Sequence, residues 1–168
     1  MTKCEVPLLF LDKKEPFVLT NKEIVKAIPI LVNSMECLGD DWETKDTVLS
    51  DSIEIKFPQW AGEFLLDHIL PYSTPTGNDK PTVENFADAN AKTLDELKVI
   101  LELSNFFQCT EFMSCISFVV AKKLEVTSME EISKFFGMSL DKDSKYFTEA
   151  DGWIHPPLVV FQGENKPN

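Results

Sequence analysis

Side chains that could perform catalysis or bind a metal are present in this chain, but they are not spaced for either task. The two histidines, His68 and His155, lie far apart, and neither has a ligand-forming residue at metal-site spacing. The acidic pairs at 40–41 and 130–131 are expected by chance, because 28 residues of the chain are Asp or Glu. No nucleophile elbow, phosphate-binding loop, dinucleotide-binding glycine motif or HExxH sequence occurs. We therefore expect no enzymatic activity, no cofactor and no metal ion.

The charge and the cysteines bear on partners and compartment. The formal net charge of −12 disfavours nucleic acid and anionic membranes, because both attract clustered basic side chains. It fits a basic protein partner, and equally a solvated acidic surface. No apolar run reaches the length of a membrane span and no signal peptide is evident, so we expect reduced thiols in the cytoplasm and nucleus. None of the cysteines forms a CxxC pair: Cys4, Cys37, Cys109 and Cys115.

The elements of the first half are predicted from apolar runs and turn residues. Apolar stretches at 6–11 and 16–19, separated by polar residues, indicate a β-hairpin. A capping box from Thr20 to Glu23 predicts a helix start, and Pro29 divides the helix into two. The second helix is expected over 30–38, before Gly39.

A strand and a further helix are expected next. Residues 40–52 are polar and are predicted to be a loop. The alternation of Ile53, Ile55 and Phe57 with charged residues has the period of a strand. A helix is expected over 60–70, followed by a disordered loop at 72–85 that is rich in proline.

The second half is predicted to be helical. Capping boxes at Thr93–Glu96 and Ser128–Glu131 each predict a helix start. An apolar face predicts another helix over about 111–124, and Gly137 fits the end of the last one. Aromatic residues are abundant here. We expect Phe135 and Phe136 not to be buried together, because neighbouring helical positions point about 100° apart.

The order of these elements and several sequence blocks resemble the Skp family of BTB/POZ proteins. Residues 103–108 (L-S-N-F-F-Q) are similar to that family's A-A-N-Y-L-D, and residues 128–136 (S-M-E-E-I-S-K-F-F) to its T-P-E-E-I-R-K-T-F. The separation of these two blocks matches without a gap. Residues 147–149 (F-T-E) match a following block, and Asp12 and Phe17 stand in for the family's S-D-G-x-x-F hairpin. The resemblance covers about residues 5–153.

The resemblance implies an α+β fold: a BTB/POZ domain at 5–108, a C-terminal helical F-box-binding extension at 109–153, and a tail at 154–168. It implies a non-catalytic adaptor of an SCF-type ubiquitin ligase that bridges a cullin and F-box proteins. Asn105 and Phe106 would bind the cullin. The residues that would contact the F-box are Leu97, Leu101, Met113, Val120, Leu124, Ile132, Phe135, Phe136 and Trp153.

Some positions depart from the family pattern. The hairpin turn reads K-K-E-P at 13–16 in place of the glycine turn, and Phe106 replaces a tyrosine. Pro156–Pro157 stands where the family has a final helix. Two alternatives remain: an elongin C-like adaptor, which the helices after residue 108 disfavour, and a structural scaffold that forms a homodimer through the F-box groove.

Overall fold

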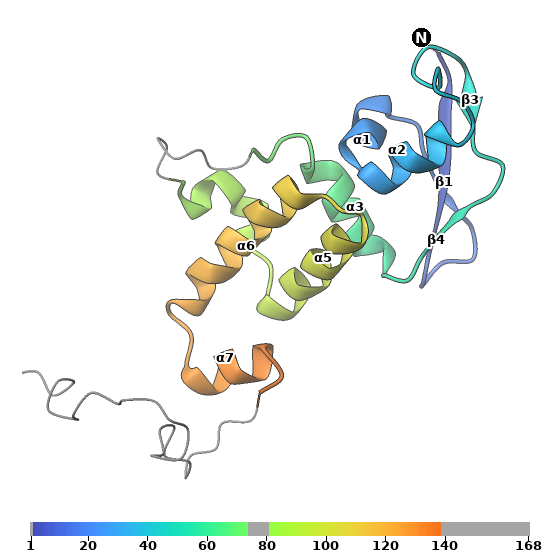
Figure 1. The fold of residues 1–168 in the computed structure, drawn as a ribbon. Coiled ribbons are helices and arrows are strands. Elements are labelled where there is room, and N and C mark those ends of the chain that lie inside the picture. The colour runs from blue at the N-terminus through green and yellow to red at the C-terminus, as the bar shows by residue number, and fades with distance from the viewer. Residues whose placement is uncertain (1, 74–80, 139–168) are drawn as a thin grey trace, which may run out of the picture.

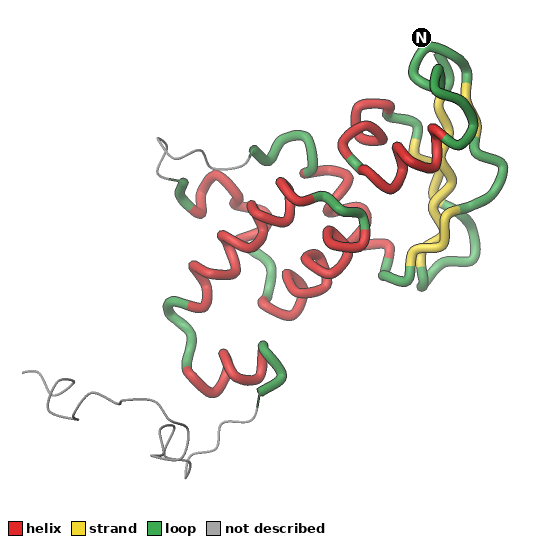
Figure 2. Tube along the Cα trace, in the orientation of Figure 1, coloured by secondary structure: helices red, strands yellow, loops and turns green. Residues whose placement is uncertain are grey.

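The computed structural model describes residues 2–73 and 81–138, which form a mixed α+β structure. Strands occupy one end of it and helices the remainder (Figure 2). The elements in chain order are β1 (Cys4–Phe10), β2 (Phe17–Leu19), α1 (Lys22–Ala27), α2 (Pro29–Glu36), β3 (Thr47–Val48), β4 (Ile53–Ile55), α3 (Gln59–His68), the 3₁₀ helix η1 (Val83–Phe86), α4 (Ala87–Asn90), α5 (Leu94–Phe106), α6 (Thr110–Leu124) and α7 (Met129–Phe135).

The sheet is built around β1. β2 pairs with it antiparallel, with Val6 opposite Leu19, which confirms the predicted hairpin. β3 and β4 pair with it in parallel, along its first and last residues respectively. Alternate residues of β1 are buried, as expected for a strand covered on one face. Figure 1 shows the helices gathered to one side of this sheet.

Helix α3 approaches the sheet at a glycine. A Cβ atom at Gly62 would lie 2.2 Å from Cε1 of Phe10, so only glycine fits with both elements in these positions. This contact brings the end of β1 against α3. The helix that follows in space, α5, packs on α3.

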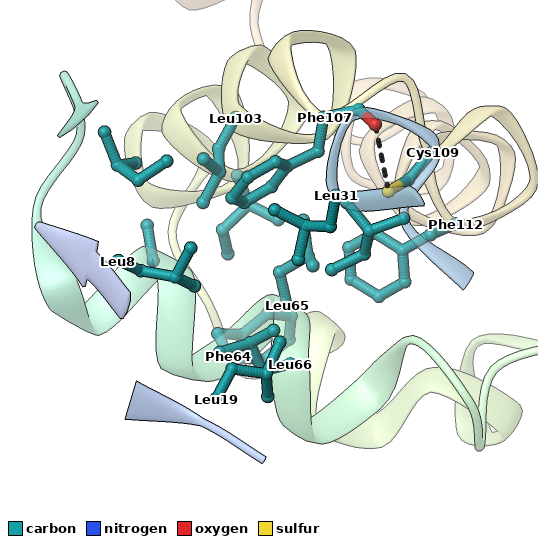
Figure 3. Packing of buried hydrophobic residues seen from close by; sticks show 14 of the residues in the cluster. Leu8, Leu19, Leu31, Phe64, Leu65, Leu66, Leu103, Phe107, Cys109 and Phe112 are labelled. Carbon is teal, nitrogen blue, oxygen red and sulfur yellow. Dashed lines mark hydrogen bonds between the residues drawn. The ribbon is translucent and has the colours of Figure 1, made fainter. Parts of the chain in front are cut away.

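One hydrophobic core runs through the described residues, from β1 to α6. Figure 3 shows Leu31 of α2, Leu65 of α3 and Phe107 after α5 pointing into a shared space, and all three are fully buried. Phe112 and other α6 residues belong to the same cluster. The core therefore continues across the domain boundary predicted at residue 108.

Several local predictions are confirmed. Pro29 separates α1 from α2 and occupies the first position of α2, where its missing amide proton costs nothing. Thr93 and Glu96 form the expected capping box: the Glu96 amide donates to the Thr93 hydroxyl at 3.2 Å, and the Thr93 amide donates to the Glu96 carboxylate at 2.8 Å. Hydrogen bonds from the backbone and side chain of Thr93 lower the pKa of Glu96. The helices predicted at 60–70, 111–124 and 129–137 are α3, α6 and α7.

Other local predictions were wrong. Asn21, and not Thr20, caps α1, because its side-chain oxygen accepts from the Glu23 amide at 3.0 Å. The strand expected through Phe57 ends at Ile55. The loop predicted at 40–52 contains β3, which exists only because it pairs with a distant part of β1. Part of the loop expected at 72–85 lies outside the described residues, and the rest includes the start of η1.

The segment of η1 and α4 is held to α3 by contacts that the sequence did not indicate. Nε2 of His68 lies 3.0 Å from Oδ2 of Asp88, and Nδ1 lies 2.7 Å from the Phe64 carbonyl. The Ala89 amide donates to the Tyr72 hydroxyl oxygen at 3.3 Å. His68 is therefore a structural residue between two helices.

Candidate protein-binding site

The end of α5 presents the first pair of residues singled out from the sequence. Asn105 is exposed, and Phe106 is half-buried. The ring of Phe106 lies 6.0 Å from that of Phe57 and 5.4 Å from that of Phe107, measured between centroids. The two residues thus lie together at the surface, and Phe106 is fixed by its aromatic neighbours.

A tight turn sets the position of this surface. The Cys109 amide donates to the Ser104 carbonyl at 2.9 Å, and the Gln108 amide donates to the Asn105 carbonyl at 3.0 Å. These are the two bonds of a Schellman motif, which places its C′ residue in the left-handed region. Gln108 occupies that position with φ 60°, where glycine is the usual residue.

Gln108→Gly is expected to raise the free energy of unfolding by about 0.5–1 kcal/mol, because glycine adopts a positive φ without strain. The matched control is Gly137→Ala. Gly137 has the equivalent place after α7 at φ 68°, and an added Cβ there meets nothing within 4 Å. Gly137→Ala should lower the free energy of unfolding by a similar amount. Urea unfolding of both variants measures this, and changes of the same sign would contradict the motif assignment.

The second candidate surface is the segment of residues 126–138, which contains α7 and which we call the α7 segment. Met129, Ile132 and Phe136 are spaced by three and four residues and so share one helix face. Met129 is 65% exposed and Phe136 57%. At the two ends of the segment, Val126 is 88% exposed and Met138 61%. Four of the ten strongly exposed large apolar side chains of the described residues therefore lie in this segment.

The structure separates the nine proposed F-box residues into four groups. Ile132 and Phe135 are half-buried and Phe136 is exposed, all in the α7 segment. Leu101, Met113 and Leu124 are half-buried. Leu97 and Val120 are buried in the core, so in this conformation neither is available to a partner. Trp153 lies outside the described residues.

The burial of Leu97 and Val120 is a correction with a simple cause. α5 and α6 pack against each other, and each uses its apolar face inside the domain. Helical periodicity identifies an apolar face but does not say what covers it. An accessible apolar face in this half of the structure therefore belongs mainly to α7.

Three of the four cysteines are buried: Cys4, Cys109 and Cys115. Burial raises the pKa of the Cys109 thiol to about 12 and also raises the pKa of Cys115 and Cys4, which keeps these thiols protonated. Within residues 2–73 and 81–138, no three His, Cys, Asp or Glu residues are grouped so that they could hold a metal ion. None of the helices in this part of the chain has the length and apolar character needed to span a membrane.

Comparison with known proteins assigns no family. No protein-family model matches the chain, and a search of curated proteins returned no match.

Proposed function

We propose that this protein is a non-catalytic adaptor with a BTB/POZ fold and a Skp-type helical extension, which bridges a cullin and F-box proteins in a ubiquitin ligase. The proposal is supported by the order of elements: a hairpin, two short helices, two short strands parallel to β1, a helix and then helices only. It is supported further by two separate accessible surfaces, since an adaptor must contact two partners. The intracellular compartments proposed with it are the cytoplasm and nucleus.

The observation that carries the proposal is the exposed apolar character of the α7 segment. Soluble monomers seldom leave contiguous apolar surface uncovered, and such surface usually marks a contact with another protein. An amphipathic helix presenting residues at i, i+3 and i+7 suits docking against a partner helix. The F-box is the partner that we assign to this face.

The cullin is assigned to the end of α5. Asn105 is exposed beside the half-buried Phe106, so a partner can reach both. The aromatic contacts of Phe106 hold that ring in place before binding, which lowers the entropy cost of forming an interface.

Affinity purification of the full chain from cells, followed by mass spectrometry, tests the function. An adaptor should recover one cullin together with several proteins that carry an F-box. Recovery of the chain alone, or with one fixed partner that has no F-box, would overturn the adaptor assignment.

A second candidate is a structural scaffold that forms a homodimer through the α7 segment. The same exposed residues favour it, because a second copy can cover them as well as an F-box can. Light scattering of the purified protein distinguishes the two: a monomer that recruits F-box proteins supports the adaptor, and a stable dimer that recruits none supports the scaffold. An elongin C-like adaptor is disfavoured by α6 and α7, which extend the helical part.

Asn105→Ala is expected to weaken cullin binding about tenfold while changing the free energy of unfolding by less than about 0.5 kcal/mol, because the side chain is exposed. Phe106→Ala should also weaken binding, but with a loss of about 1 kcal/mol from its ring contacts. Titration calorimetry and urea unfolding measure the two effects. Unchanged cullin affinity in both variants would remove this surface from the proposal.

A further inference from the structure

The C-terminal end of α7 is attached to α5 through one lysine. Nζ of Lys98 lies 3.3 Å from the carbonyl oxygen of Phe135, at the last residue of α7, and donates a hydrogen bond to it. The same ammonium lies 5.8 Å from the centroid of the Phe135 ring, over its face. A cation at the C-terminal end of a helix also complements the negative end of the helix dipole. Lys98 therefore makes three favourable interactions with α7.

Helix α7 depends on such contacts for its position. It has seven residues, which is too short for a stable helix in isolation. Figure 1 shows it beyond the end of the α5–α6 pair, on the side away from the sheet. Between it and the start of α5 lies a hollow of about 280 Å³, lined by Leu94, Lys134 and Phe135 among others, so the two helices are not fully packed there.

The position of Phe135 fixes the direction of the neighbouring exposed face. Phe135 is half-buried and packs toward the core, whereas Phe136 is exposed, and their rings meet edge to face at 5.2 Å. A contact that holds Phe135 against α5 therefore sets where Phe136 and Met129 point.

We propose that Lys98 is a positioning residue for partner binding. Its contact with the carbonyl and ring of Phe135, which we call the latch, holds the C-terminal end of α7 against α5 and thereby fixes the orientation of the exposed apolar face. The inference rests on the proposed function, because it assigns to Lys98 a role in the binding made by the α7 segment. Lys98 itself acts through Phe135 rather than through a partner.

Hydrogen exchange of the full chain tests the latch without any partner. Lys98→Met keeps the aliphatic stem and removes the ammonium, so the amides of Ile132, Phe136 and Gly137, which bond within α7, should exchange about three- to tenfold faster. Lys98→Arg keeps the charge and the donors and should retain most of the protection. Lys122→Met is the control, because Lys122 pairs with Glu125 at the C-terminal end of α6, and it should leave the exchange of the α7 amides unchanged.

Binding of an F-box protein gives the second readout. Lys98→Met should weaken this binding about three- to tenfold. The F-box affinity of Lys98→Arg should be close to that of the original chain, and that of Lys122→Met should be unchanged. Unchanged exchange in α7 for Lys98→Met would overturn the latch. Faster exchange in α7 with unchanged F-box affinity would overturn the positioning role. If no chain binds an F-box protein, the proposed function fails and the positioning role fails with it, whereas the exchange result still decides the latch.

Discussion

Phe136→Asp is expected to abolish capture of an F-box protein, with an affinity loss of more than about a hundredfold. A carboxylate buried at an interface without a partner costs several kcal/mol, and Phe136 is the more exposed of the two aromatic residues in the α7 segment. The free protein should keep its stability, since the side chain is 57% exposed before binding. Titration calorimetry measures the affinity, and thermal unfolding checks the fold.

Phe136 is a better test position than Ile132. Ile132 is half-buried in the free chain, so Ile132→Asp would lower the stability of α7 as well as remove a contact. The matched control is Leu11→Asp, a change of the same kind at a side chain that is 72% exposed after β1, far from α7. An F-box protein that binds Phe136→Asp as tightly as Leu11→Asp would show that the α7 segment is not the interface. Light scattering on both variants tests homodimer formation through the same face.

Phe107→Ala should lower the free energy of unfolding by about 3–5 kcal/mol, the largest stability effect that we expect. The ring of Phe107 is fully buried where α2, α3 and the end of α5 meet, and truncation leaves a cavity there (Figure 3). Urea unfolding followed by circular dichroism gives the difference directly.

Phe136→Ala is the comparison for Phe107→Ala, because it removes the same atoms from an exposed site. Its effect should remain within about 0.5 kcal/mol. Equal losses in the two variants would mean that α7 is packed as firmly as the core, which would contradict its description as an accessible face.

The sequence alone predicted the elements whose signals are local. A capping box joins residues three apart, so Thr93–Glu96 and Ser128 with Glu131 mark helix starts wherever the rest of the chain lies. Pro29 ends one helix and begins the next because its ring fixes φ and removes the backbone N–H. The hairpin of β1 and β2 also forms between near neighbours. Such signals locate a helix start only to within about one residue. The sequence predicted Thr20 as the cap of α1, whereas its neighbour Asn21 caps the helix.

Only the tertiary structure decided which apolar surfaces are covered. Leu97 and Phe136 both lie on apolar helix faces, yet the first is in the core and the second is exposed. The difference arises because α5 has α3 and α6 beside it, whereas in the α7 segment it is Phe135, and not Phe136, that packs against the core. β3 likewise exists through pairing with residues far away in sequence. The period of the sequence shows that a helix face is apolar. Whether that face is buried depends on the elements that pack against it, and the apolar face left uncovered is the candidate binding site.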